Sequence, residues 1–448
     1  MSIAQGPEAL SDDAVEQVWA AVQRGDRATI VNSPPGAGKS TLVRRIALRY
    51  SETGNRAVVL AQTNAQVDDL VLGLAHEVTQ RPERAQRIGR LLSSTHPAAT
   101  DFVAYPNIIA SNKLAALSQC RVLVTTVKKL ASLRGGQHHW PMLIIDEAYQ
   151  MRSDELLLLG YHTDRLLMVG DPGQLAPFTS AEEGLFRRGR LSPISDAATT
   201  IRTTNPNATL IDLPVSWRLD ARAADVISDA FYAAPFEGAY GPGVRRLYAQ
   251  ELNLRQPERR AVHVAGQYGW AYIELPAALM PPVDDEVVAS IAGVIRSLLT
   301  DTGALVDERG QRSMLDEGSI AVGVVHVAQK TAVEEAVAAV CTELGHSPDR
   351  VTVDTANRLQ GREFDVTVVW HPLSGRRDAS DFHLDAGRLC VLLSRHRHSC
   401  IVISRGGLRE QIEGSPRTSD VWINDHHPRL DGTRAHLRIL ENLEGHRV

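Results

Sequence analysis

A glycine-rich segment near the start of the chain has the residues that bind phosphate groups. Residues 32–41 read Asn-Ser-Pro-Pro-Gly-Ala-Gly-Lys-Ser-Thr, follow the apolar run 28–31 and open a stretch with helical periodicity. In a strand, loop and helix of this order, backbone N–H groups converge on phosphates, a lysine adds positive charge and a hydroxyl binds Mg²⁺. The sequence therefore predicts a nucleotide phosphate site made by Pro35, Gly36, Ala37, Gly38, Lys39, Ser40 and Thr41.

One position of this loop departs from the usual pattern. Ser33 stands where the first glycine is normally found, which leaves the tightness of the first turn open. A chance Gly-Lys-Ser in a surface loop is the alternative interpretation. The apolar strand before the loop and the helix after it favour the phosphate site.

Two adjacent carboxylates are candidates for the chemistry. Asp146 and Glu147 directly follow the apolar run 142–145, and the end of a buried strand is where α/β sheets present reactive groups. We expect Asp146, together with Ser40, to hold Mg²⁺, and Glu147 to orient and deprotonate the attacking water. A solvated helix start is the alternative for an Asp-Glu pair, and the preceding strand disfavours it.

Short apolar runs rich in Val, Ile and Leu alternate with helical stretches, which is typical of parallel sheets covered on both faces. They form two series, so the sequence predicts two α/β domains, residues 1–195 and 196–448. We expect residues 80–118 to be a helical insertion, and a short polar tail from about 405 to end in a helix at 433–443. The runs are 28–31, 57–60, 121–125, 142–145 and 166–169, then 208–213, 271–275, 320–327, 351–354, 365–370 and 400–404.

Composition limits the classes of protein. The 448 residues carry 48 Lys+Arg against 53 Asp+Glu, a net charge of -5, so any contact with nucleic acid has to be a local groove. No run approaches the roughly 20 apolar residues of a membrane helix, and the chain begins without a signal-peptide pattern. We therefore expect a cytoplasmic protein without membrane contact. Aromatic residues are only 5%, so a long stacking platform for bases is not expected. The cysteines, expected to be small core residues, are Cys120, Cys341, Cys390 and Cys400.

The remaining motifs resemble those of the superfamily 1 helicases, in the branch of the nonsense-mediated-decay RNA helicase and related DNA helicases. Residues 59–70 resemble motif Ia, and residues 124–126 resemble the threonine motif that follows it. Residues 170–177, Gly-Asp-Pro-Gly-Gln-Leu-Ala-Pro, are similar to motif III, whose glutamine, here Gln174, reports the γ-phosphate to the nucleic-acid side. The resemblance implies that the single-strand path is lined by Thr63, Asn64, Thr125 and Thr126.

The second half of the chain continues the resemblance. Residues 213–219 are similar to motif IV, 353–366 to motif V and 388–397 to motif VI. The resemblance implies two tandem RecA-like domains with the ATP site in the cleft between them. It also implies arginine fingers, which are arginines that reach the γ-phosphate when the domains close. The fingers would be Arg218 and Arg395, with Gly361 and Glu363 near the nucleotide and Gln17 reading the adenine.

The family implies an ATP- and Mg²⁺-dependent helicase or translocase that moves 5′ to 3′ on single-stranded DNA or RNA and unwinds duplexes, acting as a monomer. The alternative is an ATP-driven switch or motor subunit that regulates or loads a partner, such as a nuclease, without unwinding alone. A small-molecule kinase is disfavoured because it leaves residues 170–177 and 360–363 without a role.

Overall fold

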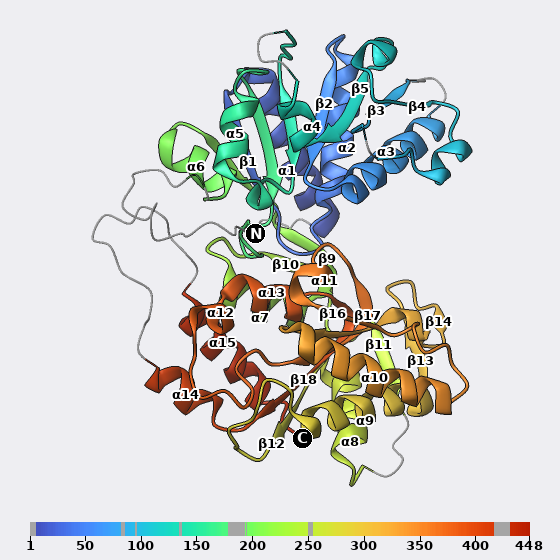
Figure 1. The fold of residues 1–448 in the computed structure, drawn as a ribbon, viewed down its shortest axis with the longest axis vertical. Coiled ribbons are helices and arrows are strands. Elements are labelled where there is room, and N and C mark those ends of the chain that lie inside the picture. The colour runs from blue at the N-terminus through green and yellow to red at the C-terminus, as the bar shows by residue number, and fades with distance from the viewer. Residues whose placement is uncertain are drawn as a thin grey trace. The chain divides into compact units, whose positions relative to one another are not determined.

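The computed structural model describes residues 6–81, 86–94, 96–133, 137–177, 193, 195–249, 254–415 and 431–448. The chain divides into two compact units (Figure 1). The first comprises Met1–Pro172 and Ala176–Pro214, and the second comprises Gly173–Leu175 and Val215–Val448.

The first unit is built on an eight-stranded parallel sheet with the strand order β4-β3-β5-β2-β6-β7-β1-β8. Its central strands are almost wholly apolar because both faces of the sheet are buried. The strands are β1 (Ala28–Asn32), β2 (Ala57–Ala61), β3 (Ile88–Leu91), β4 (Ile108–Ser111), β5 (Val122–Thr126), β6 (Leu143–Asp146), β7 (Leu166–Gly170) and β8 (Thr209–Asp212).

Helices cover both faces of this sheet. Ile144 packs in one core with α1, α2 and α3, whereas its neighbour Ile145 packs in a second core with α4, α5 and α6. Successive strand residues point to opposite faces, so one apolar run supplies two cores. The helices are α1 (Pro7–Arg24), α2 (Lys39–Glu52), α3 (Asn64–Thr79), α4 (Val127–Ala131), α5 (Ser153–Leu159) and α6 (Ala197–Thr204).

The prediction of a helical insertion at residues 80–118 is wrong. Within its described part, this stretch adds the parallel strands β3 and β4 to the sheet, together with two short 3₁₀ turns, Thr100–Ala104 and Leu114–Leu117. Arg90 hides the pattern of β3, because a charged residue stands in a buried strand. Its guanidinium is fully buried and is neutralised by Asp68 of α3, with Arg90 Nε 2.7 Å from Asp68 Oδ1.

Residues 208–213, expected in the second sheet, instead form β8 at the edge of the first. β8 pairs in parallel with β1, from Thr29 opposite Thr209 to Asn32 opposite Asp212. An apolar run shows that a strand is buried but not which sheet it joins. The two units therefore divide after Pro214, whereas the sequence analysis placed the domain boundary between residues 195 and 196.

The second unit holds a five-stranded parallel sheet with the order β12-β18-β17-β15-β16. Helices α8, α9 and α10 share one core with it, and α7, α13, α14 and α15 share the other. The strands are β12 (Trp270–Leu275), β15 (Ile320–Val324), β16 (Thr352–Thr355), β17 (Phe364–Trp370) and β18 (His396–Arg405). The helices are α7 (Ala221–Phe231), α8 (Pro257–Tyr268), α9 (Asp285–Asp301), α10 (Val327–Glu343), α11 (Ala356–Leu359), α12 (Asp381–Leu384), α13 (Ala386–Leu393), α14 (Leu408–Gly414) and α15 (Gly432–Glu444).

Two smaller sheets complete the second unit. One pairs β9 (Val215–Asp220) with β10 (Glu237–Tyr240), and the other joins β11 (Arg246–Ala249), β13 (Thr302–Val306) and β14 (Arg312–Ser313). Two parallel-sheet units in tandem confirm the predicted α/β, RecA-like fold class.

The C-terminal segment is part of the core. The predicted helix at 433–443 is confirmed as α15, but the description of the tail as polar is wrong for this helix, because Ala435, Ile439 and Leu443 are buried against α7 and α13. All four cysteines are buried and none forms a disulfide, as expected of core residues. Within the described ranges, the model contains no helix that is both apolar enough and long enough to cross a membrane.

Candidate functional site

The phosphate loop lies between β1 and α2, at the carboxyl edge of the first sheet. Gly36 has φ +74° and Gly38 has φ +80°, a left-handed conformation that glycine adopts without strain. Gly38 is the N-cap of α2, so the helix begins at Lys39 with its free N–H groups directed at the loop. This is the local geometry that binds anions.

Ser33 does not disturb this geometry. Its backbone N–H donates to the carbonyl oxygen of Gly170 at 2.8 Å, which joins the start of the loop to the end of β7. The φ of Ser33 lies outside the left-handed region. The turn therefore has no conformational requirement for glycine at this position, and the question left open by the sequence is resolved.

The predicted catalytic groups of the first unit lie together. The Lys39 ammonium forms an ion pair with the Glu147 carboxylate. Burial alone would lower the pKa of Lys39, but the carboxylates of Glu147, Asp146 and Asp171 raise it above its usual value. Burial raises the pKa of Asp146 to about 6, against the attraction of Lys39. One buried ammonium therefore balances three carboxylates.

The turn after β6 holds Glu147 in an unusual conformation. Glu147 has φ 56° and ψ 42°, in the left-handed region that non-glycine residues rarely adopt. Its N–H donates to Asp146 Oδ1 at 2.9 Å. A Cβ on Gly170 would lie 2.9 Å from Tyr149 Cδ2 and 3.0 Å from the Ala148 nitrogen, so the glycine allows this turn to pack against β7. Such strain persists where the surroundings fix it, often at functional sites.

A polar chain that the sequence analysis missed supports the same turn. The Tyr149 hydroxyl donates to Asn32 Oδ1 at 2.6 Å, and Asn32 Nδ2 donates to Asp212 Oδ1 of β8 at 2.8 Å. Asn32 is the last residue of β1, directly before the loop. The strand pairing of β8 was needed to find this link, because Asp212 is far from Asn32 in sequence.

The donor set fits a nucleotide with Mg²⁺. Ser40 and Thr41 are exposed in the first turn of α2, beside Lys39, and Asp146 supplies a carboxylate at the end of β6, which β7 separates from β1. Hydroxyl and carboxylate oxygens are ligands that Mg²⁺ accepts. Gln17, predicted to read the adenine, is exposed on α1.

The four residues predicted to contact nucleic acid lie at the carboxyl ends of β2 and β5, which pair in parallel with Ala61 opposite Thr126. Thr63 caps α3, and Thr126 caps α4. Asn64 Oδ1 accepts from Arg90 at 2.9 Å. Thr125 is fully buried and donates to the Leu91 carbonyl at 2.8 Å. Of the four, Thr63 is the most exposed.

The second unit brings most of its predicted site residues together. Arg218 Nε lies 3.1 Å from Glu363 Oε2, and Arg218 Nη1 donates to the Ser394 carbonyl at 3.2 Å. Arg395 is only 1% exposed, and it donates to the Val391 carbonyl at 3.0 Å and to Ser394 Oγ at 2.8 Å. Gly361, with φ +83°, forms the turn before β17. Glu363 and Arg395 directly precede β17 and β18, at the amino edge of this sheet.

The segment that resembles motif III is shared between the units. Gly170 and Asp171 belong to the first, whereas Gly173–Leu175 groups with the second, where Leu175 joins the core. A Cβ on Gly387 of α13 would lie 2.6 Å from the Gln174 carbonyl oxygen. Close packing against α13, the helix that leads to Arg395, therefore fixes the backbone of Gln174.

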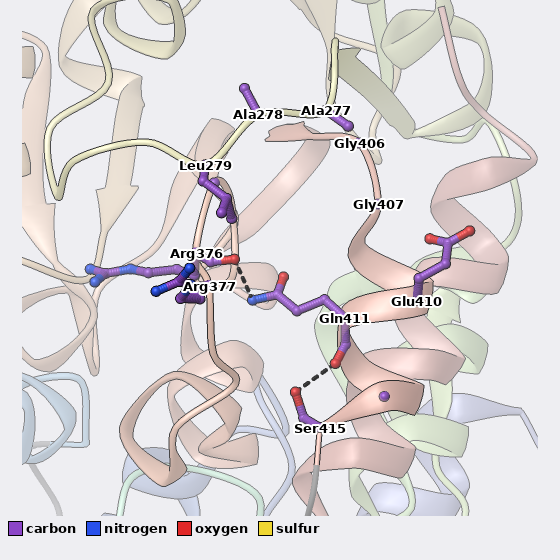
Figure 2. A pocket seen from close by; sticks show the side chains of 12 residues that line it. Ala277, Ala278, Leu279, Arg376, Arg377, Gly406, Gly407, Glu410, Gln411 and Ser415 are labelled. Carbon is purple, nitrogen blue, oxygen red and sulfur yellow. Dashed lines mark hydrogen bonds between the residues drawn. The ribbon is translucent and has the colours of Figure 1, made fainter.

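A pocket of about 500 Å³ lies elsewhere in the second unit, beside α14. Figure 2 shows Gln411 reaching across it to the backbone carbonyl of Arg376, a hydrogen bond of 3.0 Å. Glycines make up much of its wall, and none of the predicted site residues lines it.

Two family models, both described as AAA domains, match the chain, one over residues 9–187 and the other over residues 289–406. The chain is similar to the DNA replication ATP-dependent helicase/nuclease DNA2 of Bos taurus, with 23% identity over 84% of this chain and 35% of the relative. The protein of the same name from Saccharomyces cerevisiae is 21% identical over 53% of this chain and 15% of the relative. The chain thus spans about a third or less of the length of these relatives.

Two solved structures are also similar. The structure of PRRSV helicase has a TM-score of 0.44 and 14% identity, covering 90% of this chain and 57% of that one. The DUF1998 helicase MrfA bound to DNA and AMPPNP has a TM-score of 0.42 and 12% identity, covering 88% of this chain and 48% of that one.

One AAA-domain match lies largely in the first unit and the other lies within the second, and the similarity to DNA2 extends across the boundary between them. The phosphate loop and the Asp-Glu turn both lie within the first of these matches. These findings together show that the chain carries two matches to AAA domains and is similar to ATP-dependent helicases, as the resemblance of its motifs to superfamily 1 predicted.

Proposed function

We propose that the chain is an ATP-hydrolysing motor that moves on single-stranded nucleic acid. The observation that carries the proposal is the buried group of Lys39, Asp146 and Glu147 beside the first turn of α2. A bare phosphate-binding loop needs no buried carboxylates, whereas hydrolysis needs a metal ligand and a base.

Each group has a distinct role in hydrolysis. The N–H groups of the first turn of α2 and the Lys39 ammonium bind the phosphates of ATP. Ser40 and Asp146 hold Mg²⁺, which neutralises phosphate charge when bound. Glu147 orients the attacking water and takes its proton. The left-handed turn fixes the Glu147 carboxylate at the strand end, where Lys39 also lies.

The second unit supplies arginines in the same proposal. Arg218 and Arg395 act as fingers on the γ-phosphate, and the Glu363 carboxylate holds the Arg218 guanidinium until phosphate replaces it. Gly361 and Glu363 lie near the nucleotide. Loss of the γ-phosphate removes the arginine contact, which is how hydrolysis is coupled to movement. We further propose 5′ to 3′ movement with duplex unwinding, with Thr63 and its neighbours on the strand path.

The second candidate is a motor subunit that loads or regulates a partner without unwinding alone. The name of these relatives joins a helicase to a nuclease, and the match covers 35% of the bovine protein. Strand displacement from a forked duplex by the purified chain alone would argue against this alternative.

Steady-state ATPase with Mg²⁺, measured without polymer and with single-stranded DNA or RNA of equal length, tests the proposal. We expect stimulation by at least one polymer, no turnover in Lys39→Ala, and loss of stimulation in Arg395→Ala. Wild-type turnover in Lys39→Ala would refute the site. Turnover that ignores both polymers would refute the nucleic-acid motor and favour the partner-dependent subunit.

A further inference from the structure

A buried arginine that no motif predicted holds the backbone of Arg218. Arg245 directly precedes β11 and is only 4% exposed. Its guanidinium donates from Nη1 to the Arg218 carbonyl at 2.5 Å and from Nη2 to the Trp217 carbonyl at 3.0 Å. Its Nε lies 2.8 Å from Glu308 Oε2, and its central carbon lies 4.4 Å from the centre of the Tyr240 ring. One rigid guanidinium fork therefore joins β9, which carries Arg218, to the carboxylate of Glu308.

The hydrogen bonds from Arg245 reach β9 where its strand pairing is irregular. The register of β9 with β10 shifts between Ser216 and Asp220, so that three residues of β9 lie opposite one residue of β10. A bulge of this kind locally disrupts the ladder of strand hydrogen bonds. Trp217 and Arg218 lie in this interval, where the Arg245 guanidinium adds two hydrogen bonds to the backbone. The backbone that carries the Arg218 side chain is therefore held by Arg245 at the point where β10 pairs with it least regularly.

The carboxylate that pairs with Arg245 is also fixed. Glu308 lies in the turn between β13 and β14, where Asp307 Oδ1 accepts the N–H of Arg309 at 2.9 Å and that of Gln311 at 2.8 Å. Burial would raise the pKa of Glu308, but hydrogen bonds from its own N–H and from Arg245 bring it below its usual value. Glu308 is therefore ionised at neutral pH and neutralises the buried guanidinium.

The same carboxylate reaches the segment of the second predicted finger. Arg397 Nη2 lies 3.4 Å from Glu308 Oε2. Arg397 is the second residue of β18, which begins directly after Arg395. Arg245 and Glu308 thus link the strand that carries Arg218 to the strand that follows Arg395.

We propose that Arg245 is a positioning residue for ATP hydrolysis. Its guanidinium, neutralised by Glu308, sets the place from which the Arg218 side chain reaches the γ-phosphate. All three of its nitrogens are used by two carbonyls and a carboxylate, so Arg245 acts through Arg218 and not on the phosphate. A catalytic group that is misplaced by about 1 Å loses on the order of 100-fold in rate. The inference rests on the proposed function, because it names what positions one of the fingers.

A second buried arginine separates a positioning role from a purely structural one. Arg405 is 3% exposed, pairs with Asp284 at 2.8 Å and donates to the Pro276 carbonyl at 3.3 Å. It therefore has the same kinds of partner as Arg245. Arg405 is the last residue of β18, at the opposite end of this strand from Arg395. Its loss should destabilise the fold without moving either finger.

The test is steady-state ATPase of the full-length protein, with Mg²⁺ and single-stranded DNA or RNA, in a double-mutant cycle of Arg245→Met and Arg218→Ala. We expect Arg245→Met to lower kcat about 100-fold with an unchanged KM for ATP, because a finger acts in the transition state. In the Arg218→Ala background, Arg245→Met should lower kcat no further, because both changes remove the same interaction. Arg405→Met, the matched control, should keep the wild-type kcat.

The outcomes separate this inference from the proposed function. A wild-type kcat in Arg218→Ala would overturn the finger assignment and the inference with it. Impaired turnover in Arg218→Ala together with normal turnover in Arg245→Met would overturn the inference alone. Equal losses from Arg245→Met with and without the Arg218 side chain would also overturn it, as would an equally large loss in Arg405→Met.

A milder variant keeps the test decisive if Arg245→Met does not fold. Arg245→Lys retains a positive charge beside Glu308, but a lysine has no planar fork with which to bridge two carbonyls. We expect the same loss of kcat, again absent in the Arg218→Ala background. A wild-type kcat in Arg245→Lys would overturn the inference.

Discussion

Removal of the Lys39 ammonium should destabilise the nucleotide-free protein, and more than removal of its partner does. Lys39 balances Glu147, Asp146 and Asp171, and the side chains of the ion pair are only 17% and 9% exposed. Lys39→Met removes the cation that all three carboxylates share. Removing one partner of a buried pair costs about 3–5 kcal/mol. Glu147→Gln leaves Lys39 with two carboxylates and an amide oxygen, and should cost about 1–2 kcal/mol.

Urea unfolding without nucleotide, followed by far-UV circular dichroism, measures both costs, provided that the slope of the transition is unchanged. Lys330→Met is the matched control. Lys330 pairs with Glu334 at 2.6 Å on α10, with Glu334 44% exposed, and a surface pair of this kind contributes about 0.3–0.5 kcal/mol. Equal costs for Lys39→Met and Lys330→Met, or a larger cost for Glu147→Gln than for Lys39→Met, would refute this account.

Three further predictions concern other parts of the fold. Gly170→Ala should abolish ATPase because its Cβ would lie 2.9 Å from Tyr149 Cδ2 in the Glu147 turn, whereas Gly414→Ala, with nothing within 4 Å, should leave turnover normal; equal activities would contradict this. Asp68→Ala should lower the free energy of unfolding by about 3–5 kcal/mol, because it removes the carboxylate that neutralises the buried Arg90 guanidinium. Urea unfolding measures this cost, and a small change would mean that the fold does not need the ion pair. His396 and His436 are buried, with pKa values lowered to about 4 and about 3. As the pH falls, these histidines are therefore protonated in the unfolded chain before they are protonated in the folded protein. Each of these two histidines should therefore lower the unfolding free energy below pH 6.5, by up to about 1.4 kcal/mol per pH unit, while the raised pKa of Asp146 acts in the opposite direction below pH 6. The difference in unfolding free energy between the wild type and His436→Leu should therefore change with pH below 6.5, and a constant difference would count against the assignment.

The sequence predicted those parts of the fold in which local pattern and burial agree. The apolar strands before the phosphate loop and before Asp146 are continuous because both faces of the sheet are covered, and the loop itself carries its glycines in order. β3 was missed because Arg90 interrupts its apolar pattern, and the ion pair with Asp68 that permits this burial is visible only in three dimensions. β8 was found as a strand but given to the wrong sheet, because pairing is a long-range property.

The candidate site shows the same division. Lys39 and Glu147 were predicted and lie together, whereas the link from Tyr149 through Asn32 to Asp212 depends on strand order. Thr125 was selected by motif position, but its hydroxyl is used within the core.

The backbone at Ser33 bears on how such loops are recognised in other sequences. What this position supplies is an N–H for the Gly170 carbonyl, and the side chain there is only 2% exposed. Any small residue other than proline meets both conditions. A search template that demands glycine at the first position of the loop excludes residues that the backbone accepts. A template that also accepts serine or alanine there, while keeping Gly38 and Lys39, would recover sequences that the stricter template discards.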